Sequence, residues 1–102
     1  MLSMELTDRQ RRYLEGRAHP LRPVIQIGAS GLTDAVTRET DRALGDHELI
    51  KVRMRATDRA TRDSALADLA ERTGSALVRR IGHVAVLYRP RPELPKIVIP
   101  DE

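Results

Sequence analysis

The sequence predicts a single α/β domain whose elements follow the order α-β-α-β-α-β-β. Apolar residues recur at helical spacing in three segments and alternate with period two, or run together, in the short segments between and after them. The chain has 102 residues, which is the size of one domain. It contains no Phe or Trp and only 2 Tyr, so we expect an aliphatic core of Val, Leu, Ile and Ala.

The first helix is expected to begin after Thr7 and to end before Pro20. Thr7 and Gln10 form a capping-box pattern, in which each side chain accepts the backbone N–H of the other residue. A narrow stripe of residues would face the core: Leu6, Gln10, Tyr13, Leu14 and Ala18. Residues 20–23 form a stiff connector with two prolines, and residues 23–27 are predicted to be a short, mostly buried strand.

The second helix is expected to begin at Thr33 as N-cap and to end at Gly45. Glycine is common just after a helix because it adopts the left-handed conformation without strain. The buried face of this helix would carry Val36, Thr40, Ala43 and Leu44.

Residues 48–55 alternate between apolar and basic side chains. One side carries Ile50, Val52 and Met54, and the other carries Lys51, Arg53 and Arg55. This alternation predicts a half-buried strand with a basic outer face.

Asp58 is expected to cap a third helix that runs to about residue 73 and stops at Gly74. Residues 76–81 and 84–89 are predicted to pair as a hairpin around a tight Gly82-His83 turn. Residues 91–102 are rich in proline, so we expect an extended tail of which residues 97–99 could pack onto the domain.

Charge is distributed unevenly along the chain. The net charge is +3, and 16 of the 18 basic residues are Arg, which binds phosphate with two parallel hydrogen bonds. Codon bias in a GC-rich genome explains that ratio equally well. Residues 34–48 contain five acids and two Arg, whereas residues 49–57 and 77–91 contain three and four bases and no acid. We therefore expect separate acidic and basic surfaces, which suits a polyanionic partner.

Sequence signals for catalysis and cofactors are missing, so we expect a protein that is not an enzyme and has no metal or other cofactor. The chain has no Cys, and its three His residues have no partner at metal-ligand spacing. Ser30 lacks the G-x-S-x-G frame of a nucleophile, and no Gly-Lys-Ser/Thr sequence indicates a P-loop. A small-molecule substrate is accordingly not expected.

No apolar segment has the length of a membrane span, and residues 1–10 lack the apolar region of a signal peptide. We expect a cytoplasmic monomer that makes no membrane contact.

A two-glycine turn, Gly28-Ala29-Ser30-Gly31, links the first strand to the second helix. Plain turn chemistry is the commoner reason for such a pair. The glycines, however, allow close backbone approach, and N–H groups at a helix start attract phosphate, as in the GXXG loop of KH domains. The candidate RNA-binding residues are Gly28, Ala29, Ser30 and Gly31 with the neighbouring bases Arg17, Arg22, Lys51, Arg53 and Arg55.

Four separated motifs resemble the CRM (chloroplast RNA splicing and ribosome maturation) domain family in its single-domain, bacterial YhbY form. They are HPLRPV at residues 19–24, IGASGLT at 27–33, HELIKV at 47–52 and IGHVAVLYRP at 81–90. The resemblance covers about residues 5–90. It implies a two-layer domain with a mixed four-stranded sheet in the order 1-2-4-3, similar to the C-terminal domain of bacterial translation initiation factor three.

The same resemblance implies a function: binding of ribosomal RNA in large-subunit precursors during ribosome assembly. Many relatives carry a basic residue inside the two-glycine loop, where this chain has Ala29 and Ser30. We therefore expect the loop to act through backbone N–H groups and the Ser30 hydroxyl, with charge supplied by its neighbours.

Other interpretations of the sequence stay open. The acidic second helix could dock a basic ribosomal protein, which would make the chain a protein-interaction module. DNA binding is less favoured because no helix has the basic face that major-groove entry needs. The bases at residues 51–55 could be an ordinary solvated strand face. Few aromatics are available to stack on bases, so we expect recognition of RNA shape and phosphate.

Overall fold

The predicted α/β fold and element order are confirmed by a computed structural model, which describes residues 5–28, 30–55 and 58–101. The elements are α1 (Asp8–Ala18), β1 (Pro23–Ile27), α2 (Asp34–His47), β2 (Leu49–Met54), α3 (Arg59–Thr73), β3 (Ala76–Ile81) and β4 (Val84–Tyr88). The strands form one mixed sheet in the order β1-β2-β4-β3, in which only β1 and β2 are parallel. This is the sheet that the family resemblance implies.

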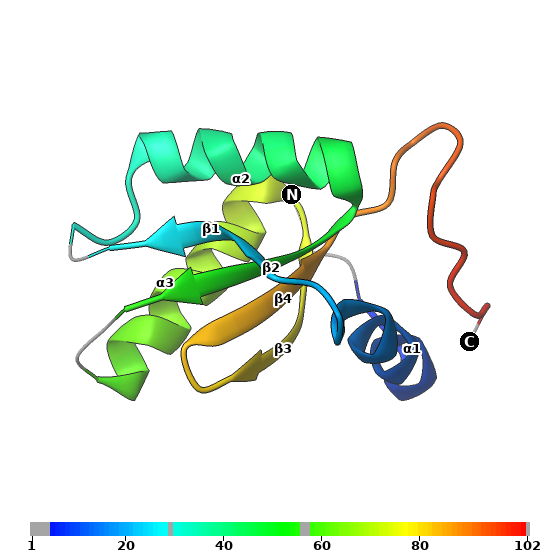
Figure 1. Cartoon of the computed structure of the whole chain (residues 1–102), viewed down its shortest axis with the longest axis horizontal. Helices are drawn as coiled ribbons and strands as arrows, with labels where there is room; N and C mark the ends of the chain where they lie inside the picture. Colours follow the sequence, from blue (N-terminus) through cyan, green and yellow to red (C-terminus); the bar gives the residue numbers. More distant parts are fainter. Residues whose placement is uncertain (1–4, 29, 56–57, 102) are drawn as a thin grey trace.

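The two faces of the sheet carry two separate apolar clusters. On one face, Leu44 of α2 and Leu66 of α3 pack with strand residues such as Val52. On the other face, Leu14 of α1 packs with residues that include Tyr88. Figure 1 looks onto this second face: α3 lies behind the sheet, α2 runs along its upper edge, and α1 lies at the right. In the part of the chain that the structure describes, the left part of the sheet therefore has no helix in front of it.

Local capping rules account for most helix ends. Both bonds of the predicted capping box are present, with Gln10 N donating to Thr7 Oγ1 at 3.1 Å and Thr7 N donating to Gln10 Oε1 at 3.0 Å. Asp58 caps α3, where the backbone N–H and then the hydroxyl of Thr61 lower the pKa of its carboxyl by hydrogen bonding. Gly74 ends α3 in the left-handed conformation, as predicted.

The predicted end of α2 at Gly45 is wrong, because the helix continues to His47 and Glu48 takes the positive φ of 65°. Glycine usually occupies such a position. Glu48 occupies it here instead, because its side chain is fully buried and its carboxylate is held by hydrogen bonds. Three backbone N–H groups donate to it, those of Arg91 (2.8 Å), Lys96 (2.6 Å) and Ile97 (3.0 Å).

The tail has no helix or strand in its described residues 91–101, yet it is held against the domain. Ile97 is buried, as the sequence suggested for this segment, and the Gln10 side chain donates to the carbonyl oxygen of Pro100 at 2.7 Å. Burial, with a smaller contribution from the charge of Glu48, raises the pKa of Tyr88. Among the described residues, no helix is long and apolar enough to cross a membrane.

Replacing Glu48 by Ala is expected to lower the free energy of unfolding by about 2 kcal/mol or more. The substitution leaves three tail N–H groups without their acceptor, and each unsatisfied buried group costs about 1–3 kcal/mol. Glu93→Ala removes an exposed carboxylate from the same tail and is expected to change stability by less than about 0.5 kcal/mol. Urea denaturation followed by circular dichroism measures both variants. Equal midpoints for the two would contradict this role of Glu48.

Candidate nucleic-acid interface

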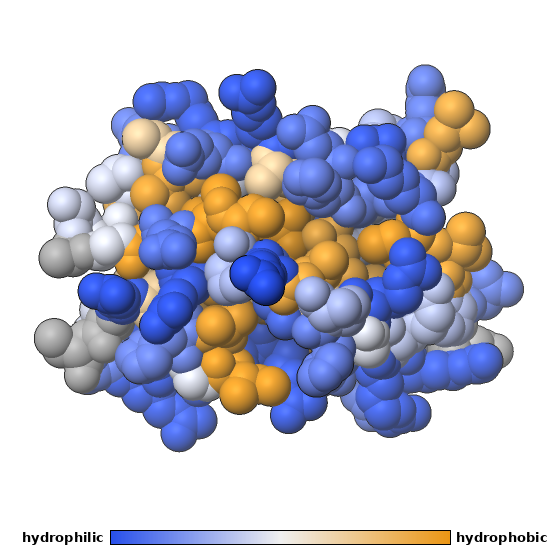
Figure 2. All heavy atoms as spheres, in the orientation of Figure 1, coloured by the Kyte–Doolittle hydropathy of each residue, from blue (hydrophilic) through white to orange (hydrophobic). Residues whose placement is uncertain are grey.

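A row of four side chains crosses the part of the sheet that α1 leaves uncovered. Gln26 of β1 pairs with Arg53 of β2, and Val84 of β4 pairs with both Arg53 and Ile81 of β3. Directly paired residues share a face of the sheet, so these four, here called the outer row, lie side by side. Gln26 and Arg53 are exposed, and Ile81 is 63 % exposed. Figure 2 shows this face, on which apolar side chains gather in the middle and hydrophilic ones surround them.

The adjacent row on this face contains Lys51 and Arg79, which bond α1 and the segment that follows it. Arg79 forms an ion pair with Glu15 of α1. The Lys51 ammonium donates to the carbonyl oxygens of His19 at 3.2 Å and Leu21 at 3.0 Å, just beyond the end of α1. Lys51 is consequently half-buried, although the alternating pattern groups it with two exposed arginines. Its ammonium holds the chain that leaves α1 against the sheet.

The two-glycine loop lies beside Arg55. The backbone N–H of Arg55 donates to the carbonyl oxygen of Ile27 at 3.1 Å, which places Arg55 next to Gly28. The carboxyl ends of β1 and β2 meet here because the two strands are parallel. Arg55 is exposed and follows the last residue of β2. Within the described part of the chain, neither Arg53 nor Arg55 forms an ion pair.

The loop itself is open to close approach by another molecule. Gly31 has a φ of 72°, and its N–H donates to the carbonyl oxygen of Gly28 at 3.0 Å, which closes a turn. Apart from its chain neighbours, a Cβ added at either glycine would meet no atom of the described residues within 4 Å. Ser30 is exposed, whereas Ala29 lies outside the described residues.

The start of α2 adds a mixed electrostatic contribution to this loop. Thr33 caps the helix as predicted, with its hydroxyl accepting the N–H of Val36 at 3.1 Å. The helix dipole favours an anion at this end, but Asp34 already places a carboxylate in the first turn. Arg53 and Arg55, which are exposed, place positive charge at the end of β2 beside this loop.

Arg17 and Arg22 form a second group, away from the outer row. Arg22 precedes β1, and Arg17 lies in the last turn of α1, where its guanidinium donates to the Tyr13 hydroxyl at 3.2 Å. Both line one pocket that the loop glycines do not line. The structure thus divides the sequence-predicted site residues between the two ends of β1.

The base-rich stretch of residues 77–91 offers less unpaired positive charge than its sequence predicts, because three of its four arginines pair with carboxylates. Each of its four arginines bonds within the chain: Arg79 to Glu15, Arg80 to Asp63, Arg89 to Asp41, and Arg91 to the carbonyl oxygens of Gly45 and Asp46. Charge counts along a sequence do not reveal such distant partners.

The sequence analysis identified Arg53 but none of the other three members of the outer row, which are Gln26, Ile81 and Val84. Ile81 and Val84 face each other across the two-residue turn, so the predicted hairpin already contained their pairing. Their position beside Arg53 and Gln26 depends on the strand order, which the alternation of residues does not contain.

The chain matches a known domain family over most of its length. Residues 6–89 match the CRS1 / YhbY (CRM) domain, and this range includes the outer row and the loop. A Haemophilus influenzae protein named "RNA-binding protein" is 43% identical over 95 residues, covering 93% of this chain and 95% of that one. "Probable RNA-binding protein YqeI" of Bacillus subtilis is 34% identical over 95 residues, covering 93% and 99%. The solution structure of the hypothetical protein SAV1595 from Staphylococcus aureus has a TM-score of 0.82 at 35% identity, covering 94% of this chain and 100% of that chain.

Gly31→Ala is expected to lower the free energy of unfolding by about 1 kcal/mol, because a side chain at positive φ is strained even where space is available. Gly28 is not at positive φ and has equal space, so Gly28→Ala is expected to stay within about 0.5 kcal/mol of the parent protein. Urea denaturation of the two alanine variants separates the cost of backbone strain at positive φ from the cost of adding a methyl group to the loop. An equal loss at both positions would contradict the described turn.

Proposed function

The chain belongs to the CRS1 / YhbY (CRM) domain family, and we propose that it is a non-enzymatic RNA-binding protein whose contact surface is the outer row with the adjoining two-glycine loop. Relatives named as RNA-binding proteins support RNA as the ligand. The observation that carries the site is the pair Arg53 and Arg55. Both are exposed, and both guanidinium groups can reach phosphate because no carboxylate in the described residues pairs with them.

The loop and the outer row would act on different parts of the RNA. A phosphate approaches the loop backbone closely because Gly28 and Gly31 have no side chain, and Arg55 beside it supplies the charge. Arg53 contacts a neighbouring phosphate, while Val84 and Ile81 offer an aliphatic surface to ribose and base. This arrangement recognises shape and phosphate and requires no aromatic stacking.

We propose further that the RNA is ribosomal and belongs to precursors of the large subunit, on which this protein acts as a cytoplasmic monomer during assembly. Resemblance to the CRM family supports this finer proposal.

The alternative partner, a basic ribosomal protein docked on α2, finds less support in the structure. Five acids in residues 34–48 motivated it. Glu48 is fully buried, and Asp41 is paired with Arg89 at 2.6 Å. The acidic surface is therefore smaller than the sequence indicates.

Removing Arg53 or Arg55 is expected to weaken RNA binding and to flatten its dependence on salt. For a single-stranded site, removing one phosphate interaction should reduce the slope of log K against log salt by about 0.7. The measurement is a salt titration of affinity for large-subunit ribosomal RNA with the parent protein, Arg53→Ala, Arg55→Ala and the double variant. Stability should change by less than about 0.5 kcal/mol, because both side chains are exposed.

Arg42→Ala is the matched control, since it removes the same charge from the exposed surface of α2 and should leave the slope unchanged. Lys51→Ala should instead lose stability as well, because Lys51 bonds the carbonyl oxygens that follow α1. A double variant that keeps the parent slope would show that this face does not contact phosphate.

The ribosomal proposal is tested by the sedimentation of an epitope-tagged protein from cells. On sucrose gradients at low salt, the protein should travel with large-subunit precursors more than with mature subunits or polysomes. If it stays in the free-protein fractions while purified protein still binds RNA, the ribosomal proposal is wrong and RNA binding stands.

A further inference from the structure

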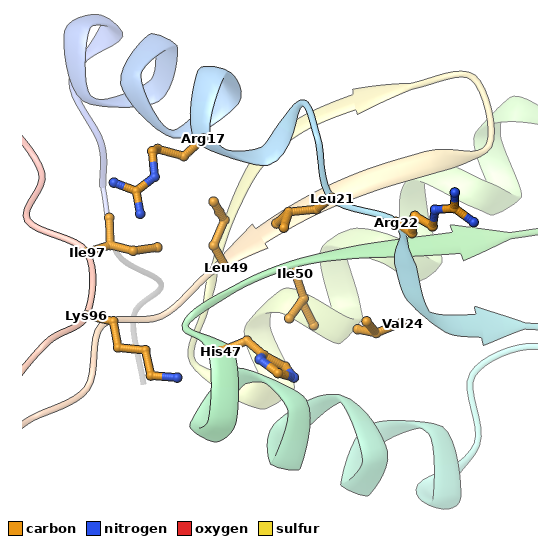
Figure 3. A pocket seen from close by; sticks show the side chains of 9 residues that line it. All are labelled: Arg17, Leu21, Arg22, Val24, His47, Leu49, Ile50, Lys96 and Ile97. Atoms are coloured by element: carbon orange, nitrogen blue, oxygen red, sulfur yellow. The ribbon is translucent and has the colours of Figure 1, made fainter.

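A pocket of about 390 Å³ lies where β1 falls short of β2. Pairing between these strands begins at Lys51, so Leu49 and Ile50 have β4 on one side and, within the described residues, no strand on the other. Figure 3 shows how the gap is surrounded: by α1, by the connector to β1, by the end of α2 and by the tail. This space is called the gap pocket.

The gap pocket combines aliphatic walls with a cationic rim. Its apolar lining comes from four separate segments and consists of Leu21, Val24, Leu49, Ile50 and Ile97. Three cations also line it, Arg17 from α1, Arg22 from the connector and Lys96 from the tail. Among the described residues, no carboxylate lines the pocket. Its charge therefore favours an anionic ligand that carries an apolar surface.

The gap pocket and the outer row both border β1. Val24 lines the pocket and Gln26 belongs to the outer row, and both are exposed, although the pairing of β1 with β2 shifts by one residue between Pro23 and Ile25. An RNA strand that contacts Arg53 can therefore reach the pocket by following the exposed residues of β1.

We propose that the gap pocket receives one unpaired nucleobase of the RNA held on the outer row, an inference that rests on the proposed function. The aliphatic walls cover the two apolar faces of the nucleobase. Arg17, Arg22 and Lys96, whose ammonium also donates to the carbonyl oxygen of Asp46 at 3.0 Å, neutralise the backbone phosphates on either side of that nucleoside. The open edge of β2 presents backbone N–H and C=O groups toward the polar edge of the base. The volume lies at the lower end of the range of about 300–1,000 Å³ for ligand pockets, which suits a single base with its ribose.

The first test needs no knowledge of the natural RNA. The ¹⁵N-labelled full chain is titrated with the four nucleoside 5′-monophosphates and, separately, with ribose 5-phosphate, which lacks a base. The amide signals of Leu49, Ile50 and Ile97 should move with at least one nucleotide and not with ribose 5-phosphate. Equal shifts with ribose 5-phosphate would overturn the proposal. So would shifts that only an Asp-Leu-Glu peptide produces, since the pocket would then take an acidic protein segment.

The second test uses two RNA hairpins that differ only in one bulged nucleotide, intact in one and abasic in the other. The parent protein should bind the intact bulge at least tenfold more tightly. Val24→Phe fills the pocket without changing the charge and should abolish this difference in affinity between the two hairpins. Val98→Phe makes the same change on a tail residue that is 79 % exposed and does not line the pocket, so it should preserve the difference.

The outcomes separate this inference from the proposed function. If the parent protein binds both hairpins equally well, the pocket does not receive a base and RNA binding stands. If it binds neither hairpin nor ribosomal RNA, the proposed function fails and the inference fails with it. If Val98→Phe abolishes the affinity difference between the intact and abasic hairpins as fully as Val24→Phe does, the effect does not come from the pocket and the proposal is wrong.

Discussion

A buried carboxylate holds the C-terminal segment of this protein to its sheet. Glu48 lies between α2 and β2, and its two oxygens accept the backbone N–H groups of Arg91, Lys96 and Ile97. Its own carbonyl oxygen accepts the N–H of Arg89 at 2.9 Å, where β4 has ended. Burying a carboxylate is costly unless hydrogen bonds replace its water, and these donors offset that cost. The tail is thereby wrapped around the end of α2, and Ile97 completes the apolar cluster beneath α1.

The α1-facing side of the sheet has a closed half, to which the tail held by Glu48 contributes Ile97, and an open half. On the closed half, Lys51 bonds the segment after α1, Arg79 pairs with Glu15, and Ile97 is buried. Positive charge there contributes mainly to folding. On the open half, Arg53 contributes to neither an ion pair nor the core in the described residues, and it remains available to a ligand. The gap pocket lies along β1 beside the boundary between the two halves.

Local features of this fold could be predicted from the sequence, and long-range ones could not. Thr7, Thr33 and Asp58 were predictable helix caps because each contacts a backbone N–H only three residues away. The role of Glu48 as the buried residue that ends α2 was not predictable, because its hydrogen-bond partners lie 43 to 49 residues further along the chain. Gly45 also offered a simpler helix end. Alternation grouped Lys51 with Arg53, but only the position of α1 determines which of the two stays exposed. The strand order came from family resemblance, and the outer row depends on it.

The central claim is that RNA lies across the open half of the sheet, and cross-linking in cells tests it most directly. Protein and RNA are joined by ultraviolet light, the attached RNA is sequenced, and the cross-linked peptides are identified by mass spectrometry. The predicted result is large-subunit precursor RNA attached to peptides from residues 22–31, 51–55 and 81–84. Cross-links confined to the outer surfaces of α2 and α3 would contradict the claim.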